Sequence, residues 1–595
     1  MAPRTLPLER STARTLPAAL AESARRVPDR TFLRFLDPAQ GEGPPRDVRF
    51  SDFRLLVCRA AAFLTTAGVG PGVRVLLLAE NSPEWQALAL AAQLLRAEPA
   101  ALFASLSGPA VVDIARRVRP KLAFVSSAEQ WAKLAPVGGE LALGGLTTLL
   151  TSEPAGLTGL PPGVRSAQVA SALGEGAPAL SLPDFEARAA SVGEDDPFLL
   201  LFTSGTTGRQ KGVRLAQRAL IHALDAGGIA TRRTERDVGV HLLPFGHIAG
   251  HDQFALALLQ GHTLILIARR DELPRALGMG PSYLFSVPLV YERIRSRALG
   301  QVERLPPLLR RLIHASLDAA TRVRVEHGGG LADRALALLA DALLGRRVRA
   351  ALGGQVEGLF AGGAPTSEAL FRFFEALGIP LVDLYGMSET AGLISANLFD
   401  GPRRPGVAGL FTPDHEVLVA PDGELLLRGP LLLTGYLEPE DAAGAYTEDG
   451  FFRTGDLVSL DADGWLRIVG RKKHLMVLST GKKVPPEPLE IALGSAPPFE
   501  GAMMLGDDRP FVAAVVFVPR DELERISAAG ADPAQALLPG ALEALAGFSD
   551  YEKPKRLLVV PGSPADYPEL ITPTLKLRRA AVLDMLRTQI QALYA

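Results

Sequence analysis

The residues best suited to chemistry form one short segment rich in hydroxyls and glycines, 203-TSGTTGRQKG-212. The apolar run 198-FLLLF-202 before it predicts a short strand, and 215-LAQRALIHAL-224 after it predicts a helix. Backbone N–H groups, hydroxyls and a helix N-terminus would then direct positive charge at one point. Because Lys211 adds a mobile cation, the segment predicts a loop that holds phosphate.

Two other interpretations of this segment compete with a phosphate loop. A Walker A loop needs Gly before its lysine and Ser or Thr after it, whereas Gln210 and Gly212 flank Lys211 here. The second alternative is a flexible turn without a ligand, because short motifs also match by chance. The order of hydroxyls, glycines and lysine between two predicted elements favours phosphate.

The elements that must position this loop alternate between short strands and helices. A helix is predicted at 85–97, and strands in five apolar runs: 74–79, 122–127, 262–268, 283–288 and 356–363. Such alternation favours a parallel sheet with crossover helices, whose ligands bind at the strand ends. Residues 291–352 read as helical, and 410–470 as short strands separated by Asp-Gly turns.

The chain therefore predicts an α/β fold with two domains. At 595 residues it is too long for one core. We place the large domain at 1–472, with parallel or mixed sheets, crossover helices and a β-barrel-like subdomain. A small, mobile α+β domain follows at 473–595.

Composition narrows the classes of function and location. The net charge of −2, without long runs of one sign, argues against nucleic acid as a partner. The single Cys58 predicts a reducing compartment and a core position for its side chain. No apolar run reaches the roughly 18 residues of a spanning helix, and no secretory h-region occurs, so a cytoplasmic location is expected.

Four further segments follow the loop in a recognisable order: 361-AGGAPTSEA-369, 385-YGMSETAG-392, 451-FFRTGDLVSLDADGWLRIVGRKK-473 and 571-ITPTLKLRR-579. Together with the loop they resemble the motifs of the ANL adenylate-forming superfamily. The last segment is similar to the terminal lysine motif of its long-chain fatty acyl-CoA synthetases. The resemblance spans residues 25 to 580, nearly the whole chain.

This resemblance implies a two-step reaction. A carboxylate attacks the α-phosphorus of ATP, which gives an acyl-adenylate and pyrophosphate; a thiolate, usually of coenzyme A, then expels AMP. The implied cofactors and co-substrates are ATP, Mg²⁺ and coenzyme A. Both steps build negative charge on oxygen, so positioning and electrostatic stabilisation would dominate catalysis.

The resemblance also assigns residues to the reacting atoms and to the nucleotide. The residues implied at the reaction centre are Thr206, His247, Ser388, Glu389 and Lys576, and those implied for Mg²⁺ are Glu389 and Thr203. The residues implied in binding ATP or coenzyme A are Thr203, Ser204, Gly205, Thr206, Thr207, Gly208, Lys211, Gly362, Gly363, Ala364, Tyr385, Gly386, Met387, Ser388, Asp456, Arg471 and Gly481.

Several of these roles are specific. Tyr385 would stack on adenine, and Asp456 with Arg471 would bind the ribose. Lys576 would reach the carboxylate and the α-phosphate only during adenylation. Lys473 occupies the hinge at which the small domain swings between half-reactions, and Gly481 would then lie along the pantetheine tunnel.

The segment 241-HLLPFGHIAGHDQF-254 contains three histidines, which raises the alternative of a metal site. No cysteine or well-placed acidic partner supports a metal there. A lone histidine is usually a satisfied core residue. By resemblance, His247 would instead contact the acyl carboxylate or the pantetheine.

The expected acid is a medium- to long-chain fatty acid. The segment 281-PSYLFSVPLVYERI-294 resembles the V-P-R-x-x-E-K segment of long-chain synthetases, although Leu289 replaces the usual Arg. The helical stretch 291–350 could add wall to an acyl channel. An amino acid is not favoured, because 245-FGHIAGHD-252 lacks the Phe-Asp pair of peptide-synthetase adenylation domains.

Other functions stay open at this point. A fatty acyl-AMP ligase would pass the acyl group to an acyl carrier protein, and a non-catalytic homologue would bind ATP and fatty acid without turnover. An α/β-hydrolase, suggested by 327-HGGG-330, fails because no G-x-S-x-G occurs. Peripheral membrane contact would suit a fatty-acid enzyme, but no basic amphipathic segment requires it.

Overall fold

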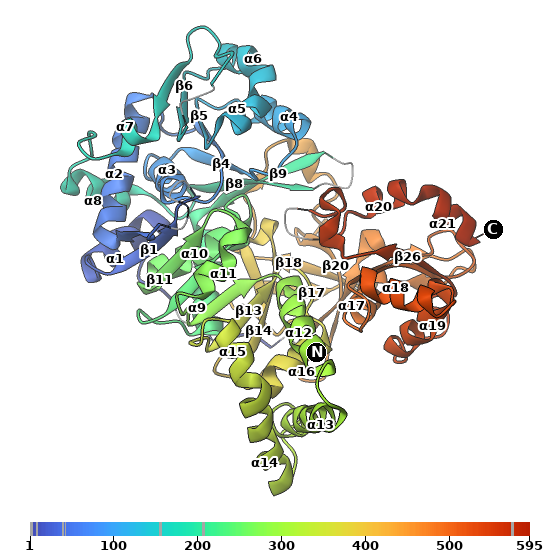
Figure 1. Ribbon diagram of the computed structural model, residues 1–595. Helices are drawn as coiled ribbons and strands as arrows, with labels where there is room; N and C mark the ends of the chain where they lie inside the picture. Colours follow the sequence, from blue (N-terminus) through green and yellow to red (C-terminus); the bar gives the residue numbers. More distant parts are fainter. Residues whose placement is uncertain are drawn as a thin grey trace.

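The structure is a computed structural model that describes residues 4–7, 10–38, 41, 43–153, 157–204, 209–572 and 576–594. Gly205, Thr206, Thr207 and Gly208, predicted to bind phosphate, lie outside these residues, as does the side chain of Ser204. A large domain fills most of Figure 1, and a small domain, coloured orange to red, lies at its side. No helix among the described residues has both the length and the apolar character to cross a membrane.

A nine-stranded sheet carries the parallel strands predicted from the apolar runs. Its order is β16 (Leu410–Phe411), β15 (Gly392–Ala396), β14 (Leu381–Met387), β13 (Gly358–Gly362), β12 (Tyr283–Ser286), β10 (Val238–His241), β11 (Thr263–Ile267), β1 (Thr31–Leu36) and β2 (Arg46–Arg49). The strands from β14 to β1 are parallel, and β15, β16 and β2 pair antiparallel at the edges.

An eight-stranded sheet forms the second layer of the large domain. Its order is β19 (Gly435–Tyr436), β9 (Gln210–Ala216), β8 (Pro197–Ser204), β4 (Glu98–Leu102), β3 (Arg74–Leu78), β5 (Leu122–Val125), β6 (Thr148–Thr151) and β7 (Arg165–Gln168). The helices in the shared core are α1 (Leu16–Arg26), α2 (Phe50–Thr66), α3 (Pro83–Leu94), α9 (Gln217–Thr231) and α10 (Ile248–Gln260). All but one residue of α3 is buried, as expected of a helix that is apolar all round.

Further helices cover the outer faces of the two sheets. Along the second sheet these are α4 (Gly108–Val118), α5 (Ala128–Leu134) and α6 (Gly138–Leu143), whereas α7 (Val169–Leu173) and α8 (Leu182–Ser191) pack against α2 and α1 in the shared core. Along the first they are α11 (Leu273–Leu277), α12 (Pro288–Glu303), α13 (Pro307–Arg324), α14 (Leu331–Ala340), α15 (Arg346–Ala351) and α16 (Glu368–Ala376). This confirms the helical region predicted at 291–352, whose α13 and α14 project away from the body in Figure 1.

The helix predicted at 215–224 is present, but its start is wrong by two residues and a strand precedes it. The chain continues there as strand β9, which pairs antiparallel with β8, and helix α9 begins only at Gln217. The reason is that Val213 and Leu215, two residues apart, both enter the core while Arg214 between them stays half-exposed. The described residues on either side of Gly205–Gly208 therefore belong to two paired strands, β8 and β9.

Residues 410–470 form mostly short antiparallel strands, as predicted. A four-stranded sheet has the order β17 (Glu416–Val419), β18 (Glu424–Arg428), β20 (Phe452–Leu460) and β21 (Leu466–Arg471). One bridge, from Gly409 to Leu466, ties it to the segment preceding β16. This sheet corresponds to the subdomain expected to be barrel-like, and a 3-10 turn at Lys472–His474 follows it.

The small domain is a compact α+β unit. It contains the pair β22 (Met476–Val477) and β23 (Lys483–Val484), and the sheet β24 (Gly501–Leu505), β25 (Ala513–Val518) and β26 (Leu557–Pro561). Its helices are α17 (Pro486–Gly494), α18 (Arg520–Ala528), α19 (Pro533–Ala544), α20 (Arg579–Met585) and α21 (Arg587–Tyr594). Alternate residues of β25 enter two separate cores, one facing α17 and α19 and the other facing α20 and α21.

Candidate functional site

A cavity of about 3060 Å³ lies between the two domains. The large domain contributes the carboxyl ends of β13 and β14, the start of α10 and the turn after β14; the small domain contributes residues around Lys576. Ligand sites at the carboxyl ends of parallel strands are the expected arrangement in an open α/β sheet. The predicted motifs therefore converge on one space.

One wall of the cavity carries a hydrogen-bonded group of three predicted residues. Strand pairing sets Asp456 of β20 opposite Arg471 of β21, and Arg471 Nε lies 2.6 Å from Asp456 Oδ1. The hydroxyl of Tyr385 donates to Asp456 Oδ2 at 2.5 Å. Burial raises the pKa of Asp456, while the Arg471 charge opposes that rise. The lone pairs that remain on this carboxylate suit sugar hydroxyls.

Strand β14 lines the cavity with residues 385–387, and the turn after it contains Ser388 and Glu389, which line the cavity as well. Burial raises the pKa of Glu389, with the charges of Arg471 and Lys211 in opposition. Gly362, Gly363 and Ala364 line the cavity as well, from the end of β13.

The phosphate segment is represented in the described residues by Thr203 and Lys211, which pair with each other across β8 and β9 and both line the cavity. Lys211 Nζ donates to the carbonyl of Asp441 at 2.9 Å and lies 5.2 Å from the centre of the Tyr436 ring. The Asp441 carboxylate accepts from Arg209 at 3.0 Å. Two cations of the segment are thus held by one residue of the β19–β20 connection.

The donors present fit Mg²⁺. Among the described residues no cluster of three or more His, Cys, Asp or Glu could hold a metal. Mg²⁺, however, binds through one or two carboxylates together with substrate phosphates. Glu389, a half-buried residue whose carboxyl pKa is raised by desolvation, and the Thr203 hydroxyl supply donors of this kind.

Lys576 enters the cavity from the small domain. Its side chain is open to the cavity, but desolvation by the surrounding protein lowers its pKa to about 8, and the nearby charges of Arg471 and Lys473 act in the same direction. Asp456 and Glu487 oppose that shift. The lysine of the last motif is therefore brought against the wall that carries Asp456, although 120 positions separate the two in sequence.

His247 lines the same cavity as Lys576 and is close enough to be affected by its charge. Its Nδ1 accepts from the backbone N–H of Ala249 at 3.2 Å and caps helix α10. Burial lowers the pKa of His247 to about 4, and the Lys576 charge adds to this effect. The imidazole is therefore neutral near pH 7, and because Nδ1 accepts a hydrogen bond, its proton lies on Nε2.

A polar contact holds the two domains together beside the cavity. Glu292 and Arg295 on α12 meet Ser495 at the end of α17: Arg295 Nη1 donates to the Ser495 carbonyl at 3.0 Å. The Ser495 hydroxyl donates to Glu292 Oε1 at 2.9 Å, and Glu292 also accepts from Arg295 at 2.9 Å. We call Glu292, Arg295 and Ser495 the interdomain latch.

Not every predicted residue is brought to the cavity. Lys473 lines it, and burial lowers the pKa of that lysine. Gly481 lies in the turn between β22 and β23, where its N–H donates to the Leu478 carbonyl, and it is not among the residues that line the cavity. In this domain arrangement the large-domain motifs and Lys576 are assembled, and the Gly481 turn is not.

Asp383 is a cavity residue that the motifs did not indicate. It receives a hydrogen bond from the Thr366 hydroxyl, and burial raises its pKa to about 7. Since alternate residues of a strand share a face, a polar residue two positions before Tyr385 was a usable signal. Its carboxyl can take part in hydrogen bonds with a base that stacks near Tyr385.

Known proteins resemble the chain along almost its whole length. The long-chain-fatty-acid–CoA ligase FadD15 of Mycobacterium bovis is 28% identical over 573 residues, which cover 93% of each chain. The putative fatty-acid–CoA ligase fadD11 of Mycobacterium tuberculosis is 32% identical over 441 residues, 69% of this chain and 76% of the relative. The A domain of the carboxylic acid reductase of Segniliparus rugosus, solved with AMP and a carboxylic acid, has a TM-score of 0.74 at 21% identity and covers 98% of this chain and 94% of its own.

Two family models also match, and they divide the chain between them. The model of the AMP-binding enzyme C-terminal domain matches residues 473–595. The model of the AMP-binding enzyme matches residues 20–437, more than half of the chain. The predicted resemblance to the adenylate-forming superfamily is thereby confirmed, and the chain belongs to the AMP-binding enzyme family.

Proposed function

We propose that the protein activates a medium- to long-chain fatty acid with ATP and transfers the acyl group to coenzyme A. The observation that carries this proposal is the meeting of Lys576 with the Asp456–Arg471 wall and His247 inside one cavity. The names of the full-length relatives, which are long-chain-fatty-acid–CoA ligases, support the choice of acid and thiol.

In the first step an oxygen of the fatty-acid carboxylate attacks the α-phosphorus of ATP, and the bond to the pyrophosphate oxygen breaks. Tyr385 and Gly362 to Ala364 would hold adenine, Asp456 and Arg471 the ribose, and Thr203 with Lys211 the outer phosphates. Mg²⁺, bound by Glu389 and Thr203, would neutralise phosphate charge. Lys576 would stabilise the charge on the α-phosphate in the transition state.

His247 would act in the same step by orienting the acid. Because its imidazole is neutral and carries its proton on Nε2, it can donate to a carboxylate oxygen without adding charge. The hydroxyl of Ser388 can reach the α-phosphate from the other side. Gly205, Thr206, Thr207 and Gly208, which lie outside the described residues, would bind phosphate on the strength of their motif alone.

In the second step the thiolate of coenzyme A attacks the acyl carbon, and the bond to AMP breaks. We propose a hinge at Lys473, between domains at 1–472 and 473–595, which removes Lys576 and brings the Gly481 turn to the cavity. The interdomain latch would open in that movement.

Pyrophosphate release, measured with ATP, Mg²⁺ and a chain-length series of fatty acids, tests the proposal. Many turnovers that require coenzyme A are expected. A single burst unaffected by coenzyme A would instead identify an acyl-AMP ligase that awaits a carrier protein. No release with any fatty acid would overturn the proposed substrate class.

A further inference from the structure

The interdomain cavity continues along the inner face of the nine-stranded sheet. This part lies away from the wall that carries Tyr385, Asp456 and Arg471, which we call the nucleotide wall. Its sides there are apolar and come from Leu224 and Gly227 of α9, Leu256 of α10, Phe285 of β12 and Phe360 of β13. Phe360 and Gly362 lie two apart on β13 and line the same space. Strand β13 spans about 13 Å at a rise of roughly 3.3 Å per residue, which sets the scale of this channel.

The far end of the channel is polar. Arg233 and Tyr283 line it there, at the amino ends of the parallel strands. This position follows from the ion-pair partners of Arg233, because Asp237 directly precedes β10 and Glu357 directly precedes β13. The reaction centre lies at the opposite, carboxyl ends of the strands. A buried guanidinium thus stands where the tail of a fatty acid would arrive.

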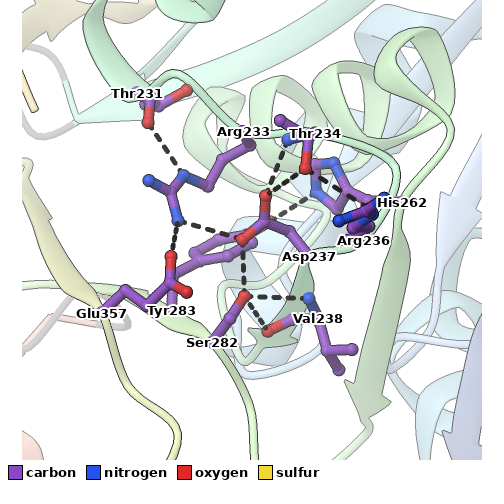
Figure 2. Close-up of polar contacts among 10 residues, drawn as sticks. All are labelled: Thr231, Arg233, Thr234, Arg236, Asp237, Val238, His262, Ser282, Tyr283 and Glu357. Carbon is purple, nitrogen blue, oxygen red and sulfur yellow. Dashed lines mark hydrogen bonds and ion pairs between the residues drawn. The ribbon is translucent and has the colours of Figure 1, made fainter. Parts of the chain in front are cut away.

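Figure 2 shows how the network holds this guanidinium. Arg233 Nε donates to the Thr231 carbonyl at 2.8 Å, and Nη1 donates to Asp237 Oδ1 at 3.0 Å and lies 3.5 Å from Glu357 Oε2. The carbon of the guanidinium is 4.1 Å from the centre of the Phe399 ring, and the Arg233 side chain is only 3% exposed. Its plane is therefore set before any substrate enters.

Asp237 balances the charge of Arg233. Burial alone would raise the pKa of Asp237, but hydrogen bonds from Ser282 and Thr234 and the Arg233 charge hold that pKa below its usual value. The carboxyl is thus ionised, and the pair is neutral. An anionic tail would gain no net attraction at this end of the channel, so the chemistry favours an uncharged group.

One arm of the guanidinium is left for a ligand. Nη2 of Arg233 donates to no acceptor in the described part of the chain, and Figure 2 draws it without a contact to the residues shown. Nη2 is not among the fully buried polar atoms that lack a partner, so it faces the open cavity that Arg233 lines. An oxygen acceptor on the substrate tail would pair with Nη2, whereas a methyl group would leave it dry and unpaired.

We infer that Arg233 is a specificity-determining residue that selects acids with a hydroxyl or carbonyl oxygen at the end remote from the carboxylate. This inference rests on the proposed function, because it concerns the tail of the acid that the same site activates. Unsubstituted fatty acids would be substrates as well, up to the length at which the methyl end meets Arg233.

The test compares unsubstituted and ω-hydroxy acids of equal chain length as kcat/KM for pyrophosphate release in the unaltered protein. At the length that reaches Arg233, the hydroxy acid should be favoured about tenfold. Unsubstituted acids that equal or exceed their hydroxy counterparts at every length would overturn the inference and leave the proposed function standing. No release with either series would count against both.

Two variants separate recognition from structure. Arg233→Lys keeps a cation for Asp237 but removes the second arm of the fork. The hydroxy-acid preference, read as the ratio of kcat/KM for hydroxy and unsubstituted acids of one length, should vanish in this variant. Arg236→Lys, an exposed residue of the same segment, is the matched control and should keep the preference. A preference that survives in Arg233→Lys would show that Arg233 only stabilises the amino ends of the strands. The comparison in the unaltered protein remains valid even if that variant fails to fold.

Discussion

The nucleotide wall and the face of the small domain contribute to one cavity but are built in different ways. Tyr385, Asp456 and Arg471 bond to one another within the large domain, so their positions do not depend on a substrate. Lys576 arrives from the other domain, beside an interdomain latch of a few polar contacts. Under the proposed function, the wall within the large domain would serve both half-reactions, and Lys576 would leave between them.

Removing Lys576 should have the largest effect, and that effect should fall on adenylation alone. In Lys576→Ala we expect adenylation to fall by roughly 10²–10³-fold, because a charge stabilising the transition state is lost. Thioester formation from supplied acyl-adenylate and coenzyme A should be preserved. Lys555→Ala, which removes an exposed lysine of the same domain, should leave both rates unchanged. Equal loss of both half-reactions in Lys576→Ala would sink the account of alternating domains.

Asp456→Asn should damage both half-reactions, in contrast to the lysine variant. Loss of a charged hydrogen-bond acceptor weakens binding by about 10–100-fold, and AMP is held through both steps. The KM for ATP and the rate with supplied acyl-adenylate report the two steps separately. Thermal unfolding of the variant shows whether the fold itself is intact. If only adenylation suffered, the wall would not be the shared part.

The pH dependence of adenylation should report the ionisation of Lys576, the residue contributed by the small domain. Because the pKa of Lys576 is lowered to about 8, its cation is present below that pH and is lost above it. We therefore expect kcat/KM for adenylation to fall about tenfold per pH unit above roughly pH 8. In Lys576→Arg this break should disappear, since arginine stays protonated. A break that persists in that variant would assign it to another group.

The smallest expected effect comes from the interdomain latch. Glu292→Gln weakens the bonds to Ser495 and Arg295, so adenylation should slow by about two- to tenfold, the size of a single hydrogen bond. Thioester formation should be unchanged or faster, because the proposed domain movement would open the latch for that step. Glu303→Gln, at the exposed end of the same helix, is the control. A slower second step in Glu292→Gln would contradict a role confined to the first arrangement.

The sequence was informative where local pattern decides structure and silent where distant segments meet. Apolar runs such as 263–267 and 283–286 were found because both faces of those strands are buried. The helix expected at 215–224 was wrong at its start, because pairing with β8 extends the strand to Ala216. Local helical pattern could not report that pairing.

The candidate site divides in the same way. Motif order located Asp456, Arg471 and Lys576, whose proximity to one another the fold then supplies. The sequence did not indicate Arg233, because its side chain contacts Phe399 and Glu357, which are far away in sequence. Neither residue stands in a motif, so only the folded chain brings the three together.

The close passage of strands β14 and β15 limits what mutagenesis of the signature segment can reveal. A side-chain carbon added at Gly386 would lie 1.4 Å from the carbonyl oxygen of Gly392, closer than any non-bonded contact. Replacing Gly386 by any other residue must therefore push the two strands apart. An inactive Gly386 variant would report a displaced backbone rather than a lost nucleotide contact, whereas Tyr385 and Ser388 on either side can be changed and interpreted directly.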